Sequence, residues 1–249
     1  MFPIRDDNPQ INQPIATYTL IGLNAVAWFA LQGAGFGDQL HASVCQYGLI
    51  PADLFAANTR GPCGEGGLGW AGLFSSMFMH GSWMHILGNM WFLWIFGGNV
   101  EDSMGPVRFT IFYFLCGIAA AAAQIITNTA SPISMVGASG AIGGVMGAYI
   151  VLFPKVKVHL LVMFIITFRV PAVAMLGYWV AVQLLGGITS LGASGGGVAF
   201  WAHVGGFAAG AALVWFFKDE ELLLNHPYHG WNQTYTDPTS VWDDPRNRQ

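Results

Sequence analysis

Six apolar stretches, separated by polar or glycine-rich segments, account for most of the chain. They run over residues Ile15–Gln32, Trp83–Gly98, Val107–Thr127, Ser139–Phe153, Val170–Ile188 and Val198–Phe217. Because the bilayer core takes about 20 apolar residues per helix, each stretch predicts a transmembrane helix. The fourth is short, which predicts a helix that starts inside the protein, where its first turn is buried or faces a water-filled cavity. The pattern therefore predicts an all-α polytopic membrane protein built as a bundle of six helices.

The first outer loop, between Gly33 and Met79, is long enough to need structure of its own. Within it, His41–Phe55 predicts a short amphipathic helix in the outer membrane interface. Cys45 and Cys63 also lie in this loop, on the side of the membrane where disulfides persist. The sequence leaves open both a bridge between them and two free thiols.

Three further segments lie outside the predicted helices. Val156–Arg169 is apolar but flanked by basic residues, so it either lies along the inner interface or extends the fifth helix. Thr189–Gly197 is glycine-rich and uncharged, which fits a mobile cover over an outward-facing cavity or a plain flexible connector. We expect residues 1–14 to be a cytoplasmic N-terminal segment, residues 15–217 the membrane domain, and residues 218–249 a cytoplasmic, largely disordered acidic tail.

Composition and charge agree with a membrane protein and predict its orientation. The chain is 54% hydrophobic and 9% charged, whereas a soluble domain carries about 25% charged residues. Lys and Arg gather on the predicted inner side, so both termini are expected in the cytoplasm. Residues 1–14 lack the features of a cleaved signal peptide or an organelle-targeting segment, which predicts a prokaryotic cytoplasmic (inner) membrane. A net charge of −4 offers no basic patch for nucleic acid.

Two apolar segments carry a chemically active residue near the same end, followed by glycines along one helix face. These residues are Ser139, Gly143 and Gly147 in the fourth segment, and His203, Gly206 and Gly210 in the sixth. Such small faces let helices approach closely in lipid, which would bring Ser139 within hydrogen-bond reach of His203. Helix packing alone explains each face taken separately, with Ser139 bonded to its own helix. An intramembrane histidine needs a polar partner, however, and this favours a nucleophile and its general base.

A third polar group lies at the outer end of the second apolar segment. His85 and Asn89 are four residues apart and therefore share one helix face. Their side chains either donate to a developing oxyanion or anchor the loop to the helix. For His80, further out, a functional role and an anchoring role are equally open. A zinc site of His80, His85 and His203 lacks HExxH spacing and a nearby acid, so we expect no metal. The sequence implies no organic cofactor either.

Carboxylates are absent from the outer halves of all six segments. Glu101 and Asp102 lie at the inner end of the second segment, well away from Ser139. Since no acid can complete a Ser-His-Asp triad, serine chemistry here would use a dyad. The same absence argues against a proton- or cation-coupled transporter, which places acids near mid-membrane.

Three motifs follow one another along the chain: His80-x4-His85-x3-Asn89, Gly137-x-Ser139-Gly140 and Ala202-His203-x-Gly205-Gly206. In this order, on six apolar segments, they closely resemble the rhomboid family of intramembrane serine proteases. The resemblance implies Ser139 as nucleophile, His203 as general base, and an oxyanion site made by the Ser139 backbone N–H with the side chains of His85 and Asn89. It places supporting residues at His80, Gly137, Gly140 and Gly206. Gln124, late in the third segment, either holds water near the site or makes a helix–helix hydrogen bond.

The resemblance also implies a fold and a substrate class. Single-span membrane proteins would be cleaved near the outer membrane face, at a small residue in a helix-destabilised segment. The first loop would be the family's membrane-embedded loop and Thr189–Gly197 its cap. Two positions depart from the family pattern. Gly143 stands where many members carry an aromatic ring against the catalytic imidazole, so the imidazole is held less rigidly or by another ring. Trp70-Ala71-Gly72 lacks the arginine of the usual Trp-Arg pair.

The leading hypothesis is an endopeptidase that hydrolyses peptide bonds through an acyl-enzyme, with membrane protein substrates and the lipid bilayer as its partners. The alternative is a catalytically silent rhomboid-like protein that binds or escorts client transmembrane proteins. The presence of both Ser139 and His203 favours the enzyme. The sequence leaves the oligomeric state open.

Overall fold

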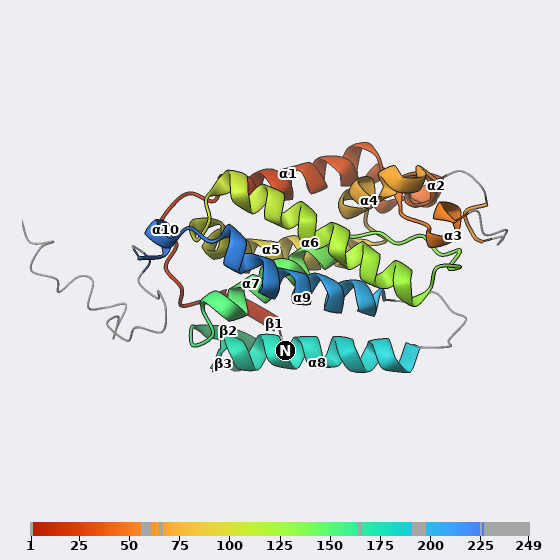
Figure 1. Cartoon of the computed structure of the whole chain (residues 1–249). Helices are drawn as coiled ribbons and strands as arrows, with labels where there is room; N and C mark the ends of the chain where they lie inside the picture. Colours follow the sequence, from red (N-terminus) through yellow and green to blue (C-terminus); the bar gives the residue numbers. More distant parts are fainter. Residues whose placement is uncertain are drawn as a thin grey trace, which may run out of the picture.

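The computed structural model describes residues 2–55, 61–64, 67–163, 166–190, 198–224 and 226, and this part of the chain is mostly helical. Each of the six predicted apolar segments corresponds to a helix. These helices are α1 (Ile15–Ala30), α5 (Trp83–Asp102), α6 (Pro106–Thr127), α7 (Ser139–Leu152), α8 (Ala172–Ser190) and α9 (Phe200–Phe217). They run roughly along one axis (Figure 1), as predicted for a helical bundle.

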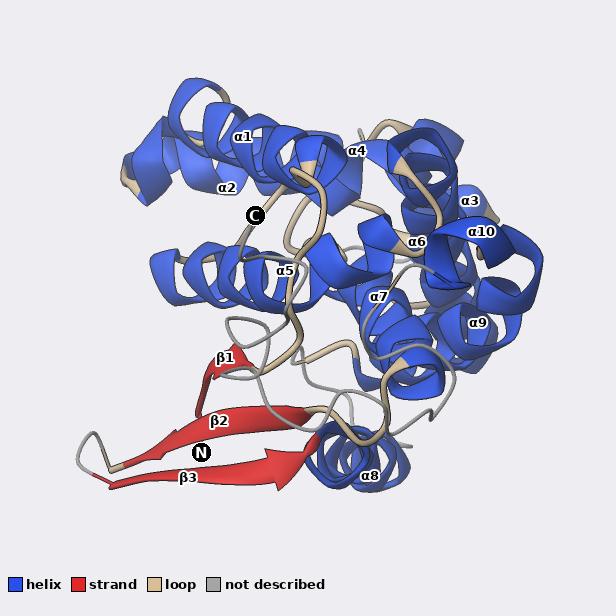
Figure 2. Cartoon of the chain, turned by 90° about the vertical axis from the view of Figure 1, so that its left-hand side faces the viewer, coloured by secondary structure: helices blue, strands red, loops and turns tan. Residues whose placement is uncertain are grey.

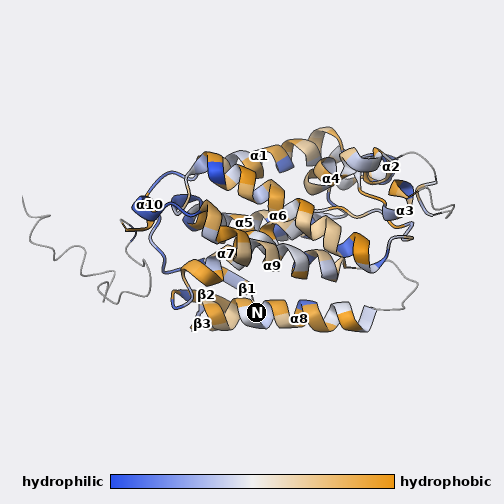
Figure 3. Cartoon of the chain, in the orientation of Figure 1, coloured by the Kyte–Doolittle hydropathy of each residue, from blue (hydrophilic) through white to orange (hydrophobic). Residues whose placement is uncertain are grey.

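The helices differ in how far they could reach through a bilayer. Within the described residues, three are long and apolar enough to cross a membrane, namely α6, α8 and α9, whereas α1 and α7 are apolar but shorter. Figure 3 shows hydrophobic residues along the length of the helices and hydrophilic ones gathered near α10 (Glu220–Leu224). Large apolar side chains such as Phe29, Val107 and Leu185 are exposed, as expected of a surface that faces lipid. That all six helices cross the membrane stays a prediction.

Helix α7 forms the centre of the bundle. Every residue from Gly140 to Tyr149 is buried, and α7 packs against α5, α6 and α9. The glycine faces predicted for close packing meet between α7 and α9. A Cβ on Gly206 would overlap the carbonyl oxygen of Gly140, and one on Gly210 would overlap that of Gly144. Only glycine therefore allows these two backbones to approach as they do.

The acidic pair at the end of α5 holds the start of α1. The Glu101 carboxylate accepts hydrogen bonds from the backbone N–H groups of Ala16 and Thr17 at 2.9 and 2.8 Å, and from the Thr17 hydroxyl at 2.8 Å. Helix α1 has no side-chain cap of its own at Pro14. Glu101 therefore satisfies donors that would otherwise be left unpaired at this helix end. The adjacent Asp102 accepts from two further backbone N–H groups just before the helix.

A small antiparallel sheet lies beside α8 and below α5 (Figure 2). It consists of β1 (Phe2–Asp6), β2 (Lys157–Val162) and β3 (Ile166–Pro171), in the order β1-β2-β3. Of the two alternatives for Val156–Arg169, an extension of the fifth helix is wrong, because the segment forms strands, whereas a place along the inner interface stays a prediction. Its two halves pair with each other, and the free edge of β2 pairs with the N-terminal segment. A strand partner so distant in the sequence leaves no trace in the local hydrophobic period.

The N-terminal strand is anchored to the helices through Asp6. Its carboxylate accepts hydrogen bonds from the Tyr149 hydroxyl on α7 and from Asn99 Nδ2 on α5. Burial raises the pKa of Asp6 to about 6, despite the hydrogen bond from Tyr149. The neighbouring Asp7 lies 2.6 Å from the His159 imidazole on β2. Polar contacts thus join the sheet to the ends of α5 and α7 opposite Ser139.

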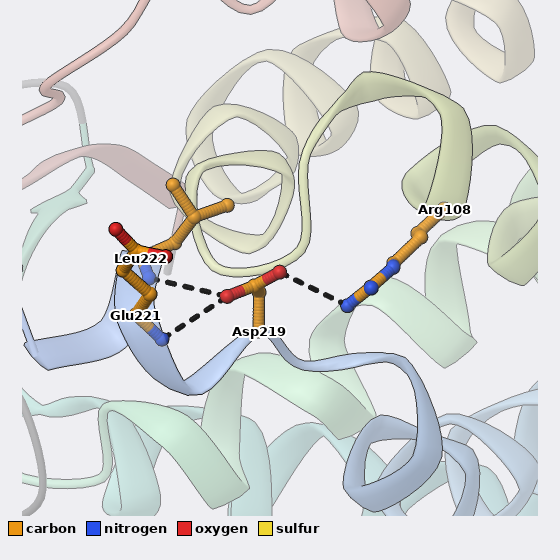
Figure 4. A network of polar contacts seen from close by, with 4 residues as sticks. All are labelled: Arg108, Asp219, Glu221 and Leu222. Carbon is orange, nitrogen blue, oxygen red and sulfur yellow. Dashed lines mark hydrogen bonds and ion pairs between the residues drawn. The ribbon is translucent and has the colours of Figure 1, made fainter.

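After α9 the chain turns back onto the corner between α5 and α6. Figure 4 shows Asp219 accepting hydrogen bonds from the backbone N–H groups of Glu221 and Leu222, at 3.0 and 3.4 Å, and from Arg108 at 3.1 Å. Asp219 thereby caps the short helix α10 within the segment predicted to be a disordered tail. Apart from His226, residues from 225 onward lie outside the described part, as do residues 191–197 of the predicted Thr189–Gly197 cover. Thr189 and Ser190 themselves end α8.

The first loop contains more helix than expected. The predicted helix His41–Phe55 is instead two helices, α2 (Gly37–Tyr47) and α3 (Pro51–Leu54), separated at Gly48. The loop continues through α4 (Gly72–Ser75), and its short 3-10 turns are η1 (Gly33–Gly35), η2 (Gly69–Ala71) and η3 (Ser76–Phe78). Cys45 and Cys63 form a disulfide that ties α2 to the loop beyond α3, which decides between the two alternatives left open by the sequence.

Candidate active site

The first residue of α7 faces the first turn of α9. Ser139 Oγ lies 2.8 Å from His203 Nε2, a distance suited to proton transfer between a hydroxyl and an imidazole. Both side chains line a cavity of about 1190 Å³, which is bordered by the start of α5, residues 130–136 and the start of α9. Ser139 and His203, predicted from two separate apolar segments, are therefore in contact at the edge of this cavity.

The backbone leading into Ser139 is held by the first loop. Met135 and Leu49 exchange two backbone hydrogen bonds, of 2.8 and 3.0 Å, and Gly137 N–H donates to Ser76 O at 2.9 Å. Gly137 has φ +124°, a region that side-chain-bearing residues rarely adopt. The chain thus makes a glycine-dependent turn and starts α7 directly afterwards. This turn sets the position of the Ser139 hydroxyl and of its backbone N–H.

The predicted oxyanion donors lie on α5, next to this turn. His85 Nδ1 accepts from Gly81 N–H at 3.3 Å, so the ring proton lies on Nε2. A Cβ built on Gly137 would lie 2.7 Å from His85 Nε2 and 3.5 Å from Asn89 Nδ2. Asn89 is buried, and its Nδ2 has no hydrogen-bond partner within the described part of the chain. Two side-chain donors therefore lie beside Gly137, two residues before Ser139.

His80 lies behind His85 rather than beside the dyad. Its ring meets the His85 ring edge-on, with centroids 5.1 Å apart. Gln32 holds the His80 backbone in both directions, since its amide donates to His80 O at 2.7 Å and accepts from His80 N–H at 2.8 Å. Burial, with a smaller effect of His85, lowers the pKa of His80 to about 3. His80 is thus neutral at ordinary pH and packs against His85.

The other predicted supporting residues act through packing and helix placement. Gln124 Oε1 on α6 accepts from Ala202 N–H at 3.2 Å, which is the helix–helix alternative, although Gln124 also lines the cavity. Gly140 and Gly206 meet where α7 and α9 touch. Glu101 lies at the far end of α5 and caps α1. Among the described residues, no group of three or more His, Cys, Asp or Glu side chains could hold a metal ion.

Comparison with known proteins agrees with this arrangement. The model of the rhomboid domain matches residues 68–220, more than half of the chain, and the matched range includes both members of the dyad. The chain belongs to the rhomboid family. It is an integral membrane protein with the helical fold of that domain.

Three relatives illustrate the likeness. The chain is 31% identical to the rhomboid protease GlpG of Haemophilus influenzae, over 61% of this chain and 70% of that protein. It is 31% identical to the rhomboid protease GluP of Bacillus subtilis, over 56% of this chain and 25% of that protein. It is 30% identical to rhomboid protein 1, mitochondrial, of Saccharomyces cerevisiae, over 59% of this chain and 41% of that protein. The matches thus span less than half of the latter two proteins.

Gly143 offers no aromatic ring to the His203 imidazole, and within this rhomboid domain residues of α8 contact that imidazole instead. A Cβ on Gly143 would lie 3.0 Å from the carbonyl oxygen of His203, a tight contact, so a larger side chain there would require α7 and α9 to shift. The Trp179 ring lies 5.7 Å from the His203 ring instead, at an interplanar angle of 39°. Gln183, one turn further along α8, has its Oε1 2.8 Å from His203 Nδ1.

Sequence reasoning missed Gln32, Trp179 and Gln183. For Gln183 a signal was present, because a polar side chain in an apolar segment is costly and usually has a partner. Its spacing of four residues from Trp179 also puts the two on one helix face. Gln32 was placed as the last residue of the first predicted span, and a polar residue at a helix end needs no special partner to explain it.

Proposed function

We propose that the chain is an intramembrane serine endopeptidase that cleaves single-span membrane proteins near the outer membrane face, with Ser139 and His203 as its dyad. The observation that carries this proposal is the 2.8 Å contact between Ser139 Oγ and His203 Nε2 at the edge of the cavity. Named proteases among the relatives support the same reaction class.

In this mechanism His203 Nε2 takes the Ser139 proton while Oγ attacks the scissile carbonyl carbon. The carbonyl oxygen becomes an oxyanion next to the Ser139 backbone N–H, His85 Nε2 and Asn89 Nδ2. These donors are held in place before the reaction, so they stabilise the developing charge without reorganising. His203 then gives the proton to the leaving amine, and a water molecule, deprotonated by His203, hydrolyses the acyl ester.

The proposed orientation puts both termini in the cytoplasm and the cavity on the outer side, in a prokaryotic inner membrane. The distribution of Lys and Arg supports it, and the sheet and α10 lie at the end of the bundle away from α2 and α3 (Figure 1). In the domain division proposed here, residues 15–217 carry the catalytic bundle, with residues 1–14 and 218–249 on the cytoplasmic side. The disulfide between Cys45 and Cys63 then lies on the outer side, where it is chemically stable.

The rival function is a catalytically silent rhomboid-like protein that binds client transmembrane segments. A silent protein has no need of a hydroxyl and an imidazole in contact, nor of an unpaired amide donor nearby. The combination of the dyad with Asn89 Nδ2 therefore favours the enzyme.

The test is cleavage of a single-span reporter, with small residues near its outer end, by the purified full chain in liposomes. The wild type is expected to release the fragment, and Ser139→Ala and His203→Ala are expected to lose this activity. Ser43→Ala is the control, because the Ser43 hydroxyl donates a hydrogen bond to Leu40 O within α2. This variant should cleave like wild type. Reporter bound but left intact by folded wild type would support the silent protein instead.

A further inference from the structure

The imidazole of His203 has a polar neighbour at each nitrogen. Nε2 faces Ser139 Oγ, and Nδ1 lies 2.8 Å from Gln183 Oε1. A carbonyl oxygen has no proton to donate, so the contact with Gln183 requires the proton to be on Nδ1. Nε2 is then left with its lone pair toward the serine hydroxyl. This is the tautomer that a general base needs.

We propose that Gln183 is a positioning residue that fixes the tautomer and ring orientation of His203. The inference rests on the proposed function and deepens it, since the dyad becomes a serine, a histidine and an orienting neutral amide. Gln183 does not touch the reacting atoms and acts through His203 alone.

The surroundings of Gln183 favour an orienting role. The residue is only 9% exposed, and the cost of burying an amide is usually offset by a hydrogen bond. Trp179, one turn earlier on α8, packs beside the same imidazole, with the two rings tilted by 39° and their centroids 5.7 Å apart. One face of α8 therefore contacts the imidazole twice, through the Trp179 ring and through the Gln183 acceptor, so that rotation of the His203 side chain would break the hydrogen bond and change the ring contact.

A neutral acceptor also suits the position. A carboxylate buried between helices carries a large desolvation penalty unless it is fully paired. The amide oxygen orients the ring without introducing a charge. Within the described part of the chain, the polar groups recorded next to His203 are the Ser139 hydroxyl on α7, the Gln183 amide on α8 and the His85 imidazole on α5, and none is acidic. The structure thus assigns to an amide the orienting task that serine proteases with a triad give to an aspartate.

Two nearly isosteric substitutions separate orientation from packing. Gln183→Met keeps the volume and removes the acceptor, whereas Gln183→Glu keeps an oxygen acceptor and adds acidity. If Gln183 orients His203, kcat for reporter cleavage falls about tenfold or more in Gln183→Met, because a hydrogen bond that sets the base is lost. KM stays within about twofold, and Gln183→Glu retains more activity than Gln183→Met. Leu184→Met, at the adjacent exposed position of α8, is the methionine control and should match wild type.

A role in packing alone predicts the opposite order, with Gln183→Met near wild type and Gln183→Glu impaired. That order, or equal kcat in wild type and Gln183→Met, would overturn the inference. Thermal unfolding of each variant shows whether the samples compared are folded.

A second measurement does not depend on activity. Nitrogen NMR of the histidine-labelled full chain, with the His203 signal assigned through His203→Ala, reports which ring nitrogen carries the proton. We expect Nδ1 to be protonated in wild type and in Ser139→Ala, and this preference to be lost in Gln183→Met. An unchanged spectrum in Gln183→Met would refute the inference even if wild type cleaves normally. Absence of cleavage with the expected spectra would refute the proposed enzyme and leave the positioning contact standing.

Discussion

Replacing Gly137 by alanine should disable the proposed oxyanion site while leaving the dyad itself intact. The backbone at this position has φ +124°, and holding a side-chain-bearing residue in such a conformation costs about 1–3 kcal/mol. The new methyl group would lie 2.7 Å from His85 Nε2. Either the His85 ring moves or the turn before Ser139 moves, and in both cases a donor no longer meets the oxyanion.

Loss of one such donor costs about 10²–10³ in kcat in a serine protease. We therefore expect kcat of Gly137→Ala to fall about a hundredfold or more, with KM nearly unchanged and the melting temperature lowered by a few degrees. The assay is reporter cleavage in liposomes over a range of reporter concentrations, together with thermal unfolding. Gly22→Ala is the matched control, because a Cβ on Gly22 meets nothing within 4 Å. Wild-type kcat in Gly137→Ala would refute the placement of the donors.

Three further predictions concern stability. Gly206→Ala should lower the free energy of unfolding by about 1–3 kcal/mol, because its Cβ overlaps Gly140 O; an unchanged melting temperature would contradict the close packing. Gln32→Leu should cost about 1–3 kcal/mol, because it leaves the buried His80 backbone unpaired, and denaturation of wild type and variant measures this loss. The pKa of Asp6 is raised from 3.8 to about 6, so the folded state binds more protons between these values and wild-type stability falls as the pH rises through this window. Asp6→Asn should flatten that slope in unfolding curves recorded from pH 4 to 7, and an unaltered slope would refute the assignment.

Much of the bundle could be predicted from the sequence because its signals are local. Runs of apolar residues predict each helix, and the glycine spacing predicts the contact between α7 and α9. The contact between Ser139 and His203 follows from that packing, since both residues start their helices at the same end. The positions of His85 and Asn89 on one side of α5 follow in the same way from their spacing of four residues.

The features that escaped prediction depend on partners far away in the chain. The strand Phe2–Asp6 is defined by its pairing with β2, so residues 1–14 read on their own as an irregular polar segment. Glu101 was recognised as remote from the site, but its role as a cap for α1 depends on where two helix ends meet. The aromatic ring that Gly143 cannot provide for His203 comes from a different helix, because Trp179 on α8 approaches the imidazole. Neither the hydrophobic period nor motif spacing contains this information.

The most direct test of the central claim is covalent trapping of the nucleophile. The purified full chain is incubated in detergent with a fluorophosphonate, and the adduct is located by intact mass and peptide mapping. An activated serine predicts one adduct on Ser139 in wild type and none in Ser139→Ala or His203→Ala. Labelling that persists in Ser139→Ala, or a folded wild type that takes up no label, would contradict the claim that Ser139 and His203 form a catalytic dyad.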